Sequence, residues 1–154
     1  MKNESQGTDL NLYYIKSNFR TIISKLCFQL YLKNITVLIN LIDSNELNEL
    51  DKFMWNYKKS LFLPHLTSND IFFENNPIYL TTNEVEPSLI KRFDVIILAP
   101  KVDLNDFGKL NKKCFLFSYF KNDSICEKNK KSLSSLKYNV KTFIETPEFN
   151  WKEI

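Results

Sequence analysis

Two continuous apolar runs constrain the fold of this chain more than any other feature. Residues 35–42 and 93–100 are rich in aliphatic and β-branched side chains, and polar and apolar positions hardly alternate in them. A strand with one solvated face alternates, whereas a central strand of a parallel sheet is covered on both faces and is apolar throughout. The two runs therefore predict central strands in a sheet that carries helices on both sides.

Weaker strand patterns and helix-start signals fill the rest of the chain. Ser17 is expected to cap a helix whose apolar residues recur every three or four positions, and Asp43 with Glu46 has the spacing of a capping box at a second helix start. The helix from Asp43 is predicted to bury one apolar face and to end at Trp55. The further strands are predicted at residues 10–15, 78–80, 114–120 and 140–144.

The last helix is marked by Ser124 and Glu127, which again have capping-box spacing. We expect this helix to run to about Tyr138, with Asn139 as the left-handed residue that ends it. Residues 87–92 are expected to form a loop or helical turn, and residues 104–113 a loop with a short helical turn.

Strands that alternate with helices predict a mostly parallel, doubly wound (Rossmann-like) α/β sheet flanked by helices. At 154 residues and 44% hydrophobic content, the chain has the size and composition of one domain. We expect a flexible N-terminal arm at residues 1–9 and a single α/β domain at residues 10–154. The arm is polar and does not have the pattern of a signal peptide, so we expect a cytoplasmic protein without a membrane partner.

The sequence does not favour nucleotide binding or catalysis. Phosphate-binding turns in such folds use closely spaced glycines, but Gly7 lies in the arm, Gly108 in a loop, and the first strand-to-helix turn at residues 15–18 contains none. His65 is the only histidine, and no nucleophile or carboxylate pair lies near it in the sequence, so it is expected to hold its loop by hydrogen bonds. We therefore predict neither a catalytic residue nor a cofactor.

The cysteines do not suggest a metal or disulfide framework. Cys27, Cys114 and Cys126 are odd in number, are scattered, and show no Cys-x-x-Cys spacing. They are expected to be buried or free thiols.

Trp55 and the segment Phe62, Leu63, Pro64 and His65 form the most distinctive stretch. It crowds apolar side chains around one helix end, and clustered exposed aromatics mark protein interfaces. An alternative is that Phe62 and Leu63 only pin a loop to the core.

The positive charge is concentrated in residues 109–141, which hold nine lysines against two acidic side chains. This region also contains the aromatic residues of the strand predicted at 114–120. Lysines around an apolar slot suit an acidic peptide with an apolar end, whereas lysines with aromatics also suit single-stranded nucleic acid. A third interpretation is that the lysines only solvate one helix face.

Taken with the strand at Leu12, residues 77–82 and Trp151, the stretch from Trp55 to His65 resembles the chi subunit of bacterial DNA polymerase III. The resemblance implies a noncatalytic accessory subunit that binds the clamp loader, through a small psi partner where one exists. It also implies binding to the acidic C-terminal tail of single-stranded-DNA-binding protein, so that DNA is contacted only indirectly.

The resemblance also assigns site residues. It implies a psi or clamp-loader contact at Trp55 and Phe62, with Leu63, Pro64 and His65 beside them. It also implies a site for the acidic tail, at the end of the strand predicted at 114–120 and on the helix that follows. The residues of this site are Tyr119, Phe120, Lys128, Lys130 and Leu133.

Two positions depart from the family pattern. Leu133 stands where the family often has an aromatic residue, and Asn34 replaces a frequent glycine. Two other hypotheses stay open at this point: a direct single-stranded nucleic-acid-binding protein, and a degenerate nucleotide-binding enzyme.

Overall fold

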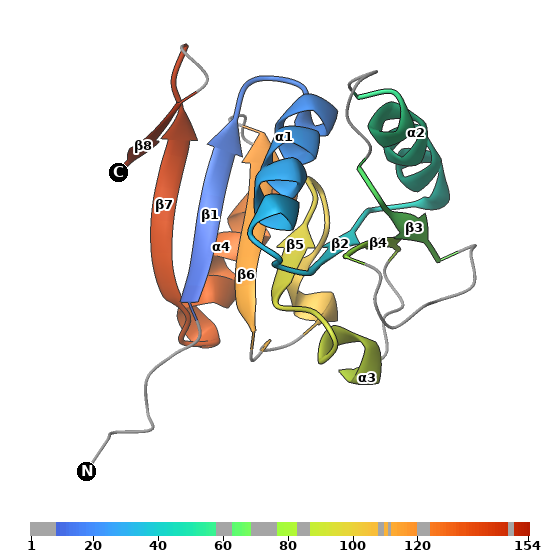
Figure 1. The fold of residues 1–154 in the computed structure, drawn as a ribbon. Coiled ribbons are helices and arrows are strands. Elements are labelled where there is room, and N and C mark those ends of the chain that lie inside the picture. Colours follow the sequence, from blue (N-terminus) through green and yellow to red (C-terminus); the bar gives the residue numbers. More distant parts are fainter. Residues whose placement is uncertain are drawn as a thin grey trace.

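The described part of the chain forms one twisted sheet with helices on both faces (Figure 1). In the computed structural model it comprises residues 9–57, 63–68, 77–82, 87–107, 110, 112–119, 124–147 and 150–154. The strands lie in the order β3-β4-β2-β5-β6-β1-β7-β8, all parallel except β8, which pairs antiparallel with β7. The predicted α/β class with a mostly parallel sheet is confirmed.

The elements follow the predicted order closely. The strands are β1 Asp9–Ile15, β2 Val37–Asn40, β3 Leu66–Thr67, β4 Ile78–Thr81, β5 Val95–Leu98, β6 Lys113–Tyr119, β7 Asn139–Glu145 and β8 Trp151–Glu153. The helices are α1 Phe19–Leu32, α2 Ser44–Trp55, α3 Pro87–Ile90, the 3-10 turn η1 Leu104–Asp106 and α4 Ser124–Ser135. Helices α1 and α2 cover one face of the sheet and α4 the other (Figure 1).

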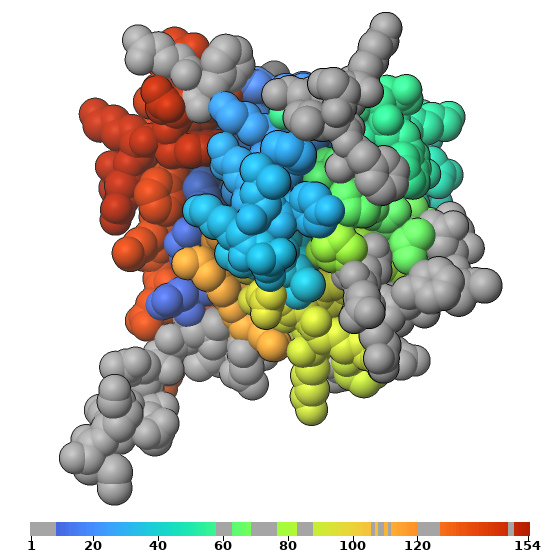
Figure 2. All heavy atoms as spheres, viewed as in Figure 1, coloured from blue at the N-terminus to red at the C-terminus, as the bar shows by residue number. Residues whose placement is uncertain are grey.

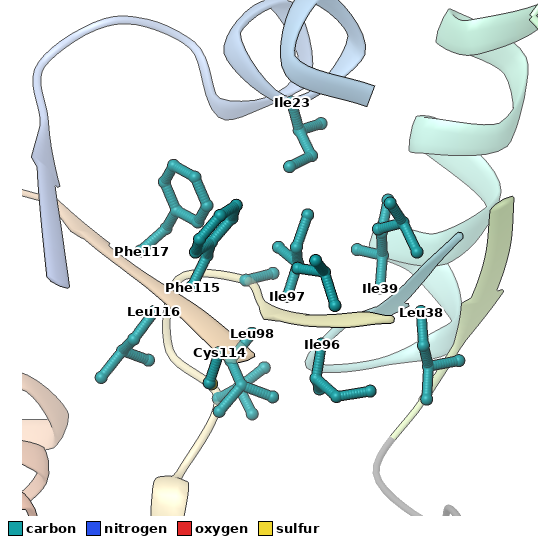
Figure 3. Packing of buried hydrophobic residues seen from close by; sticks show 14 of the residues in the cluster. Ile23, Leu38, Ile39, Ile96, Ile97, Leu98, Cys114, Phe115, Leu116 and Phe117 are labelled. Atoms are coloured by element: carbon teal, nitrogen blue, oxygen red, sulfur yellow. The ribbon is translucent and has the colours of Figure 1, made fainter. Parts of the chain in front are cut away.

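The two apolar runs contain the central strands β2 and β5, and every residue of these two strands is buried. Figure 3 shows that their side chains pack on both faces of the sheet. Ile39 and Ile97 point toward the face that carries Ile23 of α1, and Leu38 and Ile96 point toward the opposite face. A strand covered on both sides has no solvated face, which is why its sequence does not alternate.

The first helix begins differently from the prediction. Asn18, not Ser17, is the N-cap of α1, and its side chain accepts a hydrogen bond from the Arg20 N–H at 2.8 Å. Ser17 is used elsewhere, because its hydroxyl and its N–H both donate to Glu145 at the end of β7. The predicted cap of α2 is confirmed, since Asp43 accepts from the Glu46 N–H at 2.8 Å.

The ends of α1 and α4 use left-handed residues that are not glycine. Asn34 has φ 60° after α1, and Lys137 has φ 58° after α4. The prediction of Asn139 as the left-handed residue was wrong: α4 ends at Ser135, and Asn139 already begins β7. A lysine in the sequence does not indicate a left-handed residue, whereas an asparagine does, because asparagine adopts positive φ more readily. The positive φ of Asn34 explains why the family often has a glycine at this position, since glycine adopts positive φ without steric cost.

Strands β3 and β8 were not predicted, and each has only two or three residues. Asp9, assigned to the arm, is the first residue of β1. The remainder of the predicted arm, residues 1–8, lies outside the described part of the chain.

Candidate functional site

The end of α2 supports an exposed tryptophan on a buried histidine. Asp51 and Trp55 lie one helical turn apart on α2 and both face His65. His65 is only 3% exposed and its imidazole is fully buried. The Nε2 atom lies 3.0 Å from the Asp51 carboxylate and Nδ1 lies 2.8 Å from the Leu63 carbonyl oxygen. The indole of Trp55 packs on this ring at 4.3 Å between ring centres.

The predicted contact residues of this region therefore divide into two groups. Trp55 is 50% exposed and Pro64 is partly exposed, so both side chains are accessible. Leu63 and His65 are buried and lie beneath the surface as support. Phe62 lies outside the described residues. His65 binds its own segment and α2 by hydrogen bonds, as the sequence predicted.

A groove lies on the opposite face of the sheet, between α4 and strands β1 and β7. We call it the α4 groove; it is open to solvent and has a volume of about 350 Å³. Its apolar floor comes from the strands and its rim from the helix. The lining residues are Leu12, Tyr14, Lys130, Leu133, Ser134, Tyr138, Val140 and Thr142.

Lys130 supplies the positive charge of this groove. Its side chain is half-exposed, and its Nζ lies 5.5 Å from the centre of the Tyr14 ring and 4.0 Å from the Glu127 carboxylate. Leu133, one turn further along α4, is buried against the groove floor. A cation at the rim of an apolar slot can pair with a carboxylate while the slot accepts an apolar side chain.

Lys128 points away from the α4 groove. Two residues along a helix amount to a turn of roughly 200°, so Lys128 and Lys130 lie on different sides of α4. Lys128 binds Asp103 beside η1 at 2.7 Å, and its hydrogen bond, which outweighs partial burial, lowers the pKa of Asp103. Asn129 fastens the same side of the helix, since it accepts from the Leu104 N–H at 2.9 Å and donates to the Val102 carbonyl at 3.1 Å.

Tyr119 also lies away from the α4 groove. It lines a crevice of about 320 Å³ at the carboxyl edge of the sheet, between the N-termini of α1 and α2. There Arg20 of α1 and Glu46 of α2 form an ion pair at 3.7 Å. Phe120 is outside the described residues. The structure therefore brings Lys130 and Leu133 together, and places Lys128 and Tyr119 elsewhere.

Sequence reasoning missed the strand residues of the α4 groove, chiefly Tyr14, Val140 and Thr142. Alternation along residues 140–144 could have shown which side chains share a face. The pairing of β1 with β7 could not be predicted, because these strands are more than 120 residues apart in the sequence. Only that pairing brings Leu12 beside Thr142 and Tyr14 beside Ile144.

The turn between β1 and α1, where related folds bind phosphate, holds a carboxylate of the chain itself. Oε1 of Glu145 accepts hydrogen bonds from the N–H groups of Lys16 at 2.7 Å and Ser17 at 2.9 Å. Burial disfavours the charged carboxylate, but these bonds and the Ser17 hydroxyl outweigh it and lower the pKa of Glu145. Among the described residues no group of three or more His, Cys, Asp or Glu side chains could hold a metal ion.

Comparison with known proteins identifies the family. The family model for the DNA polymerase III chi subunit, HolC, matches residues 11–123 of the 154. The chain belongs to this family. It is therefore a chi-type accessory subunit of DNA polymerase III. The matched residues include Trp55 and Tyr119 but not Lys128, Lys130 or Leu133.

The other comparisons bear on the fold. No curated protein matches the chain. The crystal structure of the Pyrococcus furiosus Hef helicase domain is similar, with a TM-score of 0.53 and 10% identity over 92% of this chain. The chain spans 36% of the length of that helicase domain, and at this identity the likeness shows the fold alone. In the part of the chain that is described, no helix is both long and apolar enough to cross a membrane.

Proposed function

We propose that this chi-family chain is a noncatalytic, cytoplasmic adaptor that links the clamp loader of DNA polymerase III to the acidic C-terminal tail of single-stranded-DNA-binding protein. It contacts DNA only through that protein and uses neither a cofactor nor a membrane partner. The α4 groove carries this proposal, because Lys130 stands beside Tyr14 at the rim of an apolar slot.

The tail chemistry fits the groove. An acidic peptide that ends in apolar residues presents a terminal carboxylate, which a lysine can pair with while the apolar side chain is buried. Leu133 lines the apolar part of the groove and fills less of it than an aromatic residue at the same position would. Thr142, on the facing strand, adds a hydroxyl to the lining. We expect modest affinity that decreases as salt increases.

The clamp-loader side is proposed at Trp55, with Phe62 and Pro64 as further contacts that the resemblance implies. The indole is exposed over half its surface and is held on one side by His65. Aromatic anchors of this kind dominate protein interfaces. The partner is psi or another clamp-loader subunit.

Co-purification separates the two halves of the proposal. The tagged chain, expressed in a bacterium with its own replication proteins, should recover clamp-loader subunits and single-stranded-DNA-binding protein. Trp55→Ala should lose the clamp-loader subunits alone. Lys130→Gln should recover less single-stranded-DNA-binding protein than the wild type, with the clamp-loader subunits unchanged. If the wild-type chain recovers neither at adequate expression, the adaptor function is wrong.

Direct single-strand binding is the second candidate, since lysines and aromatics on residues 109–141 also suit phosphates and bases. Titration of a labelled tail peptide and of labelled oligothymidine distinguishes them. Tight oligothymidine binding without tail binding would replace the adaptor with a direct binder.

A further inference from the structure

A second cavity lies where β1, β6 and β7 begin, at the amino edge of the sheet. We call it the amino-edge cavity; it encloses about 440 Å³. The lining residues that matter here are Asp9, Lys113, Tyr138, Val140, Lys141 and Phe143. Lys113 and Lys141 belong to the basic stretch 109–141, but none of the six is among the site residues that the family resemblance assigned.

The amino-edge cavity adjoins the α4 groove. Tyr138 and Val140 line both, so only the short segment from α4 into β7 separates them. Side chains alternate along β7, and in the parallel register Lys141 and Phe143 share a face with Tyr13, opposite the face that lines the groove. A peptide that passes around residues 138–140 at the sheet edge therefore reaches both cavities.

The charge of the amino-edge cavity is positive. Lys113 and Lys141 are exposed, and Lys113 Nζ lies 5.8 Å from the Phe115 ring centre. Lys137, with an exposed side chain, directly precedes Tyr138. Among the described lining residues Asp9 is the one acidic side chain. The cavity therefore attracts a segment of negative charge.

We propose that the amino-edge cavity receives the acidic residues that precede the apolar end of the tail, while that end occupies the α4 groove. The inference rests on the proposed function and extends the binding site from one cavity to two. Lysines at a solvent-exposed edge speed encounter with an acidic segment and add a salt-dependent share of the affinity. Continuity with the groove favours a peptide over nucleic acid, although phosphates would use the same lysines.

Two labelled peptides test the proposal by fluorescence anisotropy. The short peptide is the apolar C-terminal end of the tail, and the long peptide adds the acidic residues before it. In the variant Lys113→Glu with Lys141→Glu, affinity for the long peptide should fall about fivefold to tenfold, since exposed charge pairs contribute modestly. Affinity for the short peptide should change less than about twofold.

The matched control is Lys25→Glu with Lys52→Glu, which changes the net charge equally at exposed positions on α1 and α2. This control should leave the ratio of long- to short-peptide affinity unchanged, and circular dichroism checks that both variants fold.

Three outcomes overturn the inference. If the wild-type chain binds the peptides but the Lys113 and Lys141 variant binds both as well as wild type, or loses both equally, the acidic residues bind elsewhere while the adaptor function stands. If oligothymidine binding alone is lost in this variant, these lysines bind nucleic acid. If the wild-type chain binds neither peptide, the proposed function fails together with the inference.

Discussion

The two candidate docking regions are built in opposite ways. At the end of α2 a convex indole stands on a buried polar support, with His65 held between Asp51 and the Leu63 carbonyl. The α4 groove is concave, with an apolar floor and a cation at its rim. A projecting anchor acts through burial, whereas a charged rim acts through electrostatics and is screened by salt. Binding at Trp55 and binding in the α4 groove should therefore differ in how much affinity a single substitution removes and in how strongly salt weakens them.

Trp55→Ala should have the largest effect on binding. Truncation of a central aromatic anchor typically costs about 2 kcal/mol or more, which is about thirtyfold in affinity. Titration with the purified clamp-loader partner measures this. Trp151→Ala is the matched control, because Trp151 is also exposed, at 37%, but lies on β8 at the far end of the sheet.

Tail binding by Trp55→Ala should equal that of the wild type. If the variant unfolds and loses every partner together, Trp55 belongs to the core and the contrast between the two regions disappears.

Glu145→Gln should lower the free energy of unfolding by about 1 to 2 kcal/mol near neutral pH, because hydrogen bonds to a buried charged carboxylate are stronger than those to an amide. The depressed pKa also fixes the sign of the pH effect. Between the folded and unfolded pKa the unfolded chain binds more protons, so stability rises with pH. The wild-type contribution is complete above the ordinary glutamate pKa and is lost as the pH falls through the lowered folded value.

Urea unfolding from neutral to acidic pH measures this effect, and the difference between Glu145→Gln and wild type should shrink as the pH falls. A difference that stays constant would show that the Glu145 carboxylate does not titrate as described. Glu153→Gln on β8, an exposed glutamate, is the control.

Lys130→Gln should weaken tail binding by about threefold to fivefold at low salt, and less at high salt. Lys128→Gln removes the same charge from the same helix. The family resemblance predicts a loss in both variants, whereas the geometry predicts it at Lys130 alone. Equal losses in a peptide titration would mean that Lys128 leaves Asp103 when the tail binds.

The smallest expected effect is at the left-handed residues. Lys137→Gly should stabilise the fold by about 1 kcal/mol or less, because glycine adopts positive φ without steric cost but loses more entropy on folding. Asn34→Gly should gain less, since asparagine tolerates this conformation. Thermal unfolding of the two variants compares them.

The local chemistry of the fold could be predicted from the sequence. The apolar runs of β2 and β5 and the Asp43 cap of α2 depend on neighbouring residues, and both predictions are confirmed. The Ser17 cap was wrong because Glu145, far along the chain, binds that serine. Contacts of this kind depend on strand order, which no local pattern contains.

In the candidate sites, too, local features could be predicted from the sequence and long-range contacts could not. Trp55 could be placed at the end of its helix, but the sequence does not reveal that His65 and Leu63 lie beneath the surface. Lysines two residues apart lie on different sides of a helix, but the sequence does not reveal that Lys128 faces Asp103 and Lys130 faces the α4 groove.

Strand β8 has a consequence for solubility. It is three residues long, carries Lys152 and Glu153, and pairs along β7 through Trp151 to Glu153. Without it, the longer strand β7, with Phe143 and Ile144, would present an unpaired edge to other molecules. Exposed edges of this kind pair with one another, and short charged strands that cover them are a common protection. A chain cut before Trp151 should therefore keep its fold yet associate with itself as its concentration rises.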